Sequence, residues 1–426
     1  MSDYASRGRK TSTRYAGLSG FRPATFDSMG KSLLSLVDGL VFDGVSRGPA
    51  EHPVHIDRGV VVGLDGSPPD GARVIHVGGR LITPGLIDAH FHAYGVDFEM
   101  MKLESLPMSY VAQKAARRLD AALRRGFTTV RDPSGGDIGL RMALEEGLMS
   151  GPRYLYTGPG LTQTGGHGDP RPAHIFAEHT CGYLSEVVDG PDNLRRAVRE
   201  RIRTGAHAIK IFASGGVMSP TDPIRQVQYD AEEVRAVCAE AARLDSYVAA
   251  HAYSPEAITH AVANGVRTIE HGNLLDGEAS ALMAERGAYL VPTLICYEAM
   301  KRRGEDLGQP LESQRKNLEV VEAGIASLEI ARNAGVRVGM GTDLIGDLED
   351  EQLFDFRVRS EVMEVGEMLR AASSVNAEII RRPDLGVIEV GATADLVVLA
   401  GNPFERPDVL WDPHRMVIQS GTVVKS

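Results

Sequence analysis

Residues 81–94 read LITPGLIDAHFHAY, and the rest of the chain is interpreted outward from this stretch. Its apolar run predicts a strand that ends in His90-Phe91-His92. Side chains two positions apart on a strand point to the same face, so His90 and His92 are expected to project together while Phe91 packs on the other side. Two such imidazoles can bind one divalent metal ion. Two unrelated histidines would give the same pattern, so further ligands at later strand ends must decide.

The middle of the chain, residues 85–383, alternates short apolar runs with amphipathic stretches rich in Ala, Glu and Arg. The strand candidates are residues 85–90, 128–133, 153–159, 208–214, 247–253, 267–272, 289–294 and 337–343. Strand and helix alternating about eight times is typical of an α/β fold of the (β/α)8 TIM-barrel type. A doubly wound open sheet is the alternative, but no G-x-G-x-x-G motif opens a first helix.

Both ends of the chain read as strands instead. Residues 31–84 and 384–426 contain short apolar runs closed by turn dipeptides such as Asp-Gly and Gly-Gly. Each end alone is too small for a good core, so we predict one small β-sandwich domain built from both termini, with two independent caps as the alternative. Residues 1–30 are polar without a sustained period, and we interpret them as an arm that is disordered or contacts another subunit.

The composition excludes several classes of protein. The chain has 426 residues, 43% apolar and 24% charged, as in an ordinary globular protein. A net charge of −11 argues against nucleic acid as a partner, and no long apolar run predicts a membrane span. The N-terminus lacks the apolar region of a signal peptide, so we expect a cytoplasmic protein, and a homo-oligomer. Three widely spaced cysteines, Cys181, Cys238 and Cys296, form neither a disulfide framework nor a zinc-finger pattern, and buried packing is favoured over a catalytic thiol.

Polar residues occur at the ends of most predicted barrel strands. In such barrels the chemistry lies at the C-terminal ends of the strands. Four histidines, one lysine and one aspartate in these positions are hard to explain as packing. The candidates are His90, His92, Lys210, His251, His271 and Asp343. Asp132 closes the second strand in the same way.

Lys210 lies between Ile209 and Ile211 and should point into the barrel. A buried ammonium is costly and its pKa falls, and divalent metals would repel it. A neutral amine can react with carbon dioxide to form a carbamate, which is an anionic bridging ligand. A Lys–Asp pair with Asp132 or Asp343 is the alternative, and the residues alone leave both open.

The order of these residues, with PGLIDAH before them and GTD at the end, resembles the amidohydrolase superfamily. The motifs RRGFTTVRD, LTQTGGHGDPR, IKIFASGGVMSPTDP, AHAYSPEAI, RTIEHGNL and GATADLVVLAGNP are similar to one branch of it. That branch holds Xaa-Pro dipeptidases (prolidases), Xaa-Arg and Xaa-Lys carboxypeptidases and imidazolonepropionase-like proteins. The resemblance covers residues 31–426 and says little about the substrate.

The resemblance implies two divalent metal ions, zinc first, with cobalt, manganese or iron as alternatives. His90, His92 and Asp343 would hold the more buried ion. His251 and His271 would hold the second, and a carboxylated Lys210 would bridge both. A bridging hydroxide would then attack the substrate. Asp343 would orient it, take its proton and pass the proton to the leaving amine, a task that suits a carboxylate.

Four further residues are candidates for substrate binding. His167 lies in a Gly-rich loop, which allows close approach to a ligand, and related dipeptidases place this histidine near the scissile carbonyl. Tyr253 shares a face with His251 and could donate to an oxyanion or a substrate carboxylate, whereas Tyr297 could wall the pocket. Arg225 could bind a carboxylate in bidentate fashion. For each of the four, a local loop or solvent contact is the alternative.

We therefore expect a metal-dependent hydrolase of amide C–N bonds that acts on a small molecule. Dipeptides of the Xaa-Pro type or N-acyl amino acids are the first substrate class. A non-peptide amide, a carbamate or a substituted urea is the second. A binding or scaffold barrel that has lost catalysis ranks last, because that class usually loses ligands and here all six positions are filled.

Overall fold

The computed structural model describes residues 33–172, 174, 182–219 and 222–426. The predicted N-terminal arm and Cys181 lie outside the described residues. In the described part of the chain, none of the helices combines the length and the apolar character that crossing a membrane requires.

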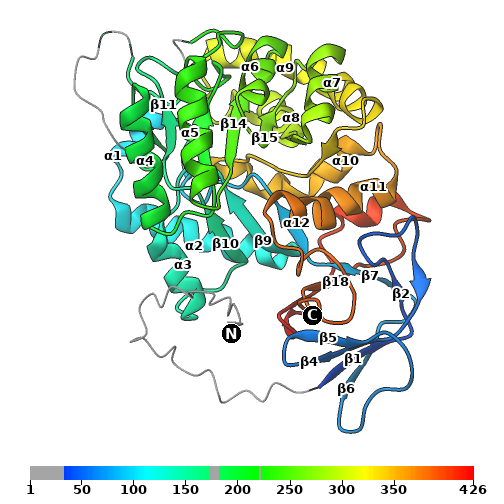
Figure 1. Ribbon diagram of the computed structural model, residues 1–426. Helices are drawn as coiled ribbons and strands as arrows, with labels where there is room; N and C mark the ends of the chain where they lie inside the picture. The colour runs from blue at the N-terminus through cyan, green and yellow to red at the C-terminus, as the bar shows by residue number, and fades with distance from the viewer. Residues whose placement is uncertain (1–32, 173, 175–181, 220–221) are drawn as a thin grey trace, which may run out of the picture. The chain divides into compact units, whose positions relative to one another are not determined.

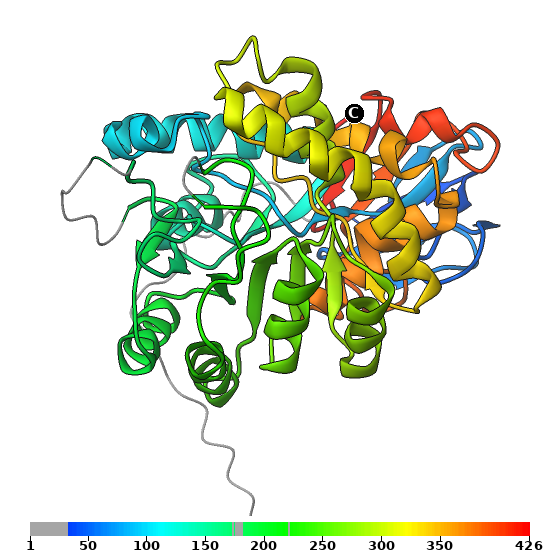
Figure 2. The ribbon, with the colours of Figure 1, turned by 90° about the horizontal axis from the view of Figure 1, so that it is seen from above.

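Parallel strands form the middle of the chain (Figures 1 and 2). They are β8 (Leu86–Asp88), β9 (Phe127–Asp132), β10 (Arg153–Tyr156), β11 (Gly160–Thr162), β12 (Ser185–Val187), β13 (Ile209–Phe212), β14 (Val248–Ala252), β15 (Thr268–His271), β16 (Tyr289–Val291) and β17 (Arg337–Val338). Hydrogen bonds join them into a sheet of order β10-β9-β8 and a sheet of order β12-β11-β13-β14-β15-β16-β17. Beyond the ends of β8 and β17, the Ala89 amide donates to the Met340 carbonyl at 2.9 Å. The arrangement is α/β and TIM-barrel-like.

All eight predicted strand segments contain a strand, but β11 and β12 were not predicted. These two strands have three residues each, and β11 lies within the Gly-rich stretch that we interpreted as a loop. Such short runs show no alternation that a sequence pattern could detect. The first strand, β8, ends at Asp88, before the two histidines. The Phe91 amide still donates to the Arg131 carbonyl at 2.9 Å, so the extended path continues past the end of the strand.

Helices follow the strands. They are α1 (Met100–Ser105), α2 (Met108–Arg124), α3 (Ile138–Glu145), α4 (Pro191–Arg203), α5 (Ala231–Arg243), α6 (Pro255–Ala263), α7 (Gly277–Arg286), α8 (Leu294–Arg303), α9 (Leu311–Asn333), η1 (Gly346–Phe354), α10 (Asp355–Arg359), α11 (Val365–Arg370), η2 (Ala371–Val375), α12 (Asn376–Ile379) and η3 (Pro407–Trp411). Side-chain caps fix several helix starts: Asp230 with Glu233 forms a capping box at α5, and Ser254 and Asp276 cap α6 and α7.

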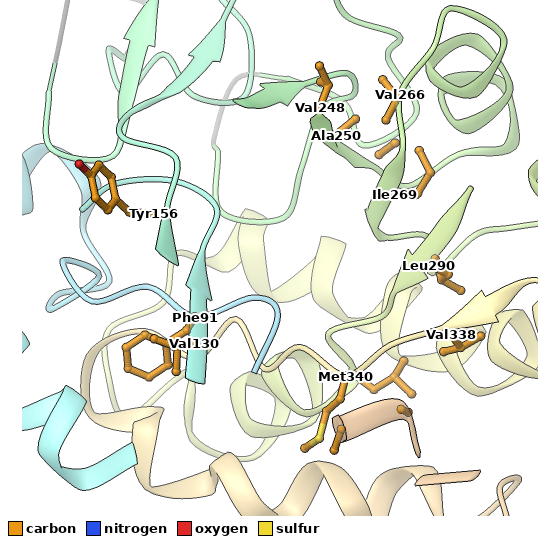
Figure 3. Close-up of a cluster of buried hydrophobic side chains, with 14 of the residues drawn as sticks. Phe91, Val130, Tyr156, Val248, Ala250, Val266, Ile269, Leu290, Val338 and Met340 are labelled. Carbon is orange, nitrogen blue, oxygen red and sulfur yellow. The ribbon is translucent and has the colours of Figure 1, made fainter. Parts of the chain in front are cut away.

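The main hydrophobic core lies on the helix-facing side of the parallel strands. Val248 and Ala250 of β14, Ile269 of β15 and Leu290 of β16 belong to it and are drawn in Figure 3. Because side chains alternate along a strand, the residues between them point to the opposite side. His251, which directly follows Ala250, is therefore directed away from this core.

Strands from both termini form two further sheets. The strands are β1 (Leu34–Val37), β2 (Leu40–Val41), β3 (Ala50–Glu51), β4 (Val54–Asp57), β5 (Val60–Gly63), β6 (Arg73–His76), β7 (Leu81–Pro84), β18 (Leu396–Val398), β19 (Met416–Gln419) and β20 (Thr422–Lys425). One sheet has the order β5-β4-β1-β6, and the other, β20-β19-β18-β7-β2-β3, joins the two ends of the chain where β7 pairs with β18 (Figure 1). Leu36 and Ile56 of the first sheet share a buried cluster with Ile82 and Val398 of the second.

Candidate metal centre and substrate pocket

One cavity of about 270 Å³ collects the predicted site residues at the C-terminal ends of the parallel strands. All six candidate ligands line it: His90, His92, Lys210, His251, His271 and Asp343. Three of the four candidate substrate residues, His167, Tyr253 and Tyr297, line it as well. The structure therefore brings residues that are far apart in the sequence together around one cavity.

Asp343 lies at the centre of this cluster. Its Oδ1 atom is 2.9 Å from His92 Nε2 and 3.5 Å from His90 Nε2, and its Oδ2 atom is 3.8 Å from His271 Nδ1. His90, His271 and Asp343 each offer one ligand atom, and these atoms lie within 4.8 Å of one another. Nitrogen and oxygen donors at this spacing fit a divalent transition metal.

A second pair of imidazoles adjoins the first group. The ring centroids of His251 and His271 are 4.5 Å apart, and His251 stacks on His167 at 4.4 Å. His251 Nε2 donates to the Gly215 carbonyl at 3.1 Å, which leaves Nδ1 as the atom of this ring with a free lone pair. His251 thus adds a nitrogen donor next to the group around Asp343.

Two of the candidate ligands have left-handed backbone conformations, with φ of +74° at His271 and +53° at Asp343. Glu270 precedes His271 within β15 and its side chain reaches His90, and His271 also lines the cavity. Consecutive strand residues normally face opposite sides. The positive φ at His271 breaks this alternation, so both side chains serve the same site.

Glu270 and Arg131 support His90 from beneath. His90 Nδ1 donates to Glu270 Oε2 at 2.7 Å, which directs Nε2 toward Asp343. Arg131 Nη2 donates to both oxygens of Glu270 at 2.7 Å, and Thr268 Oγ1 donates at 2.6 Å. Both charged side chains are 0% exposed. A carboxylate behind a histidine ligand fixes its tautomer and raises its basicity.

Neither residue of this pair was predicted as part of the site. A signal was present, because each is a charged residue inside an apolar strand and next to a predicted site residue: Glu270 precedes His271, and Arg131 precedes Asp132. Charged residues are almost never fully buried unless they are paired, so each of the two could have been predicted to have a buried partner.

Asp132 and Ser134 orient His92. His92 Nδ1 donates to the Ser134 carbonyl at 3.0 Å and lies 3.5 Å from Asp132 Oδ1. Burial alone would lower the pKa of His92, but its hydrogen bonds to Asp132 and Asp343 raise it to about 9. A metal ion would have to displace this proton, so its binding should tighten as the pH rises.

Asp88, the last residue of β8, links this first parallel strand to the segment that follows the last one, β17. Its Oδ1 accepts from the amides of His90 at 3.0 Å and Thr342 at 3.1 Å, and its Oδ2 accepts from Thr342 Oγ1 at 2.6 Å and from Gln352 Nε2 at 2.9 Å. The Asp343 amide donates to the His90 carbonyl at 2.7 Å. The distance between His90 and Asp343 is thus set by the backbone.

Lys210 is 2% exposed and faces the cavity. Within the described part of the chain no hydrogen bond or ion pair reaches its Nζ. This atom lies 5.7 Å from the centroid of the Phe212 ring. Burial lowers its pKa to about 8, although Glu270 and Asp343 act in the opposite direction. The alternative of a Lys–Asp ion pair is therefore not formed, and a larger share of the amine is neutral at neutral pH than in a solvated lysine.

Tyr253 and Tyr297 form one wall. Their hydroxyl oxygens are 2.6 Å apart, and Tyr297 Oη lies 2.9 Å from His271 Nδ1. Burial raises the pKa of both phenols well above the usual value, so the hydroxyls stay protonated and can donate. Tyr297 is thus more closely connected to the cluster than a simple wall residue would be.

Arg225 does not reach the cavity. Its side chain is 58% exposed and its Nη2 donates to Glu319 Oε1 at 2.8 Å. The structure therefore matches the alternative of a surface arginine rather than a carboxylate-binding residue of this pocket. Its loop position gave no indication of which way the side chain would point.

Apolar side chains form the outer wall of the cavity. They include Phe98, Met100, Met218, Met300 and Ile345. Cys296 also lines the cavity, where burial and the neighbouring Asp343 raise the pKa of its thiol well above the usual value. The sequence predicted buried packing for Cys296, and the cysteine is buried, but its place in the pocket was missed because it lies on α8 rather than at a strand end.

The fold and the cluster at its strand ends define a TIM-barrel-like protein with a candidate metal centre. Comparison with known proteins gives the family. A solved prolidase in complex with N-methylphosphonate-L-proline is 46% identical, covers 92% of this chain and 100% of that chain, and has a TM-score of 0.90. A solved Xaa-Pro dipeptidase with bound methionine is 30% identical, with coverages of 93% and 100% and a TM-score of 0.83. The ochratoxinase of Aspergillus niger is 32% identical over 357 residues, which are 78% of this chain and 73% of that protein.

Residues 81–425 match the amidohydrolase family, and the chain belongs to it. It is accordingly a hydrolase that acts on C–N bonds. Members of this superfamily generally use divalent metal ions, and the donor set around Asp343 is suited to them. The resemblance to the prolidase-containing branch, predicted from the motifs, is confirmed.

Proposed function

We propose that the protein is a metal-dependent dipeptidase of the Xaa-Pro type. The observation that carries this proposal is the convergence of four histidines, a lysine and an aspartate on one cavity whose wall offers two protonated phenols. The 46% identity to a prolidase that binds a proline phosphonate supports the same substrate class. A dipeptide is a small molecule that a cavity of about 270 Å³ can bind in large part.

The donor set supports a proposal for the metal ligands. We assign His90, His92 and Asp343 to one divalent ion, His251 and His271 to a second, and Lys210 as a carbamate to both. Zinc is the first choice because imidazole and carboxylate donors suit it. When bound, two such ions polarise the scissile carbonyl and activate water for attack. The lowered pKa of Lys210 and its lack of an ion pair in the described structure support the carbamate.

The remaining roles belong to side chains of the cavity. Asp343 takes the proton of the attacking water and delivers it to the leaving amine, which its central position supports. His167, stacked on His251, donates to the scissile carbonyl. Tyr253, held by Tyr297, donates to the carboxylate of the substrate or to the oxyanion. Arg225 has no role in this scheme.

N-acyl amino acids, which share the first predicted substrate class with dipeptides, form a second candidate together with bulky non-peptide amides. The apolar outer wall with its flexible methionines favours a large apolar group on the substrate. The 32% identity to ochratoxinase supports this candidate independently. Carbamates and substituted ureas fall in the same class of non-peptide substrates.

A kinetic panel on metal-loaded protein tests both candidates. It should contain Xaa-Pro and Xaa-Arg dipeptides, N-acyl amino acids, an aryl urea, and the same Xaa-Pro dipeptides with an amidated C-terminus. We expect the highest kcat/KM for Xaa-Pro and a large loss on amidation. Faster turnover of N-acyl amino acids or of the urea would replace the dipeptidase proposal by the second candidate.

The fold can be proposed in more detail than the hydrogen-bonded sheets give. We infer that the parallel strands belong to a complete (β/α)8 barrel of residues 85–383. The buried cluster shared by the two terminal sheets supports a β-sandwich domain of residues 31–84 and 384–426.

A further inference from the structure

The segment after β13, described at residues 213–219 and 222, lines part of the cavity and contacts two of its histidines. Its Gly215 carbonyl accepts from His251 Nε2 at 3.1 Å. Gly216 packs against the His167 ring so closely that a Cβ atom at position 216 would lie 2.2 Å from His167 Cε1. Asp222 Oδ2 accepts from the Gly216 amide at 3.1 Å and lies 3.4 Å from His167 Nδ1. This segment therefore helps to place the His167 ring, together with Gln228 Oε1, which accepts from the His167 amide at 2.9 Å.

Lys316, on α9, holds the same segment from outside. Its Nζ donates to the carbonyls of Gly216 at 3.2 Å, Ser219 at 2.6 Å and Asp222 at 2.7 Å. An ammonium group has three protons, and the three carbonyls use all of them. Hydrogen bonds from a charged donor are stronger than neutral ones, so one side chain fixes three points of the segment.

The next residue on α9 extends this connection to the opposite wall. Asn317 Nδ2 donates to the Tyr297 carbonyl at 3.0 Å. Neighbouring residues of one helix thus hold both the segment that contacts His167 and the helix that carries Tyr297. A shift of α9 would move the two walls of the pocket together.

We propose that Lys316 is a positioning residue for hydrolysis, acting through Gly216 and Asp222 on His167. This inference rests on the role proposed for His167 above. Lys316 does not line the cavity, so its effect reaches His167 through the backbone of the segment and through the Lys316 charge that acts on Asp222. A displacement of about 1 Å of a group that contacts the reacting carbonyl can lower turnover by about 10²-fold.

Lys316→Met tests this role, because methionine keeps an unbranched apolar chain and removes the three donors. The matched control is Arg315→Met on the same helix, since Arg315 is 82% exposed and pairs with Glu312. With Xaa-Pro substrates we expect Lys316→Met to lower kcat about 10- to 10²-fold with little change in KM and in metal content. Arg315→Met should match the wild type.

A double-mutant cycle separates positioning from general stability. In a His167→Ala background, Lys316→Met should change kcat by less than about threefold, because the group it positions is already absent. If the two effects multiply instead, or if Lys316→Met behaves like Arg315→Met, the positioning role is refuted.

Two measurements need no substrate. Hydrogen exchange of residues 213–219 should accelerate in Lys316→Met and not in Arg315→Met. The imidazole ¹⁵N signals of His167, assigned by comparison with His167→Ala, should shift in Lys316→Met but not in Arg315→Met. If Xaa-Pro dipeptides are not hydrolysed, the dipeptidase proposal fails while these two results still decide whether Lys316 holds His167. Unchanged exchange and unchanged signals would overturn the inference whatever the substrate is.

Discussion

Replacing Glu270 by Gln should destabilise the fold and weaken metal binding together. The carboxylate accepts from Arg131, Thr268 and His90, and it is 0% exposed like Arg131. Glutamine has nearly the same shape but carries one acceptor oxygen and one NH2 group. Whichever way the amide is turned, it faces at least one donor without accepting from it, and the guanidinium of Arg131 loses its counter-charge inside the barrel.

The magnitude follows from these contacts. One oxygen of Glu270 accepts two of the four hydrogen bonds, and a bond to a charged group contributes about 1.5–3 kcal/mol. Removing one partner of a buried ion pair costs about 3–5 kcal/mol, which agrees with the loss of two such bonds. Losing a carboxylate behind a ligand histidine lowers metal affinity about 10- to 100-fold.

Urea unfolding, checked for reversibility, and competition with a coloured chelator measure the two effects. Glu305→Gln, at an exposed glutamate, is the control for loss of charge. The double variant Arg131→Met, Glu270→Gln should be more stable than Glu270→Gln alone, because no unpaired charge remains buried. A Glu270→Gln protein within about 1 kcal/mol of the wild type and with unchanged metal affinity would refute the reasoning, because the cited costs would then be absent.

Three further predictions concern the metals, the proton and the pH. Elemental analysis should find about two divalent ions per chain. Lys210→Ala should lose metal and activity together, and formate or propionate should rescue part of both. Unchanged metal content in that variant would contradict the carbamate. Asp343→Asn should keep much of its metal but lose about 10²–10⁴-fold in kcat, and near-normal turnover would assign the proton to another group. Burial lowers the pKa of His207 from 6.5 to about 4, so the unfolded chain binds a proton there before the folded chain does. The contribution of this group to the unfolding free energy is fully present above pH 6.5 and is lost as the pH falls through 4, with a loss of about 2 kcal/mol at pH 5. The unfolding free energy of His207→Gln should therefore fall less between pH 7.5 and pH 5, and equal losses in both proteins would refute the assignment.

Periodicity and strand ends explain how much of the fold and site was predictable. Apolar runs followed by amphipathic stretches place β13, β14 and β15 correctly, because each strand is buried on the side of the helices and must be apolar there. Candidate ligands such as His251 and His271 follow from the rule that barrel chemistry lies at strand ends. Both inferences depend on local sequence alone.

Contacts between distant segments could not be predicted in the same way. The pairing of Arg131 with Glu270 joins β9 to β15, and no local pattern states which buried charges will meet. Arg225 shows the opposite failure: its sequence neighbours the site, yet its side chain turns to Glu319 at the surface. Lys316 lies in a helix with no motif, and its role depends on three carbonyls that the sequence does not encode as side chains.

The left-handed backbone at His271 and Asp343 makes these two positions costly for the stability of the fold. Non-glycine residues in that conformation store torsional strain that the surrounding fold must hold. Glycine at either position would relieve it. Under the roles proposed above, the same substitution would remove a candidate ligand. Stability and the proposed activity are then opposing traits at these two positions, and screening variants for thermostability alone would favour proteins that have lost that activity.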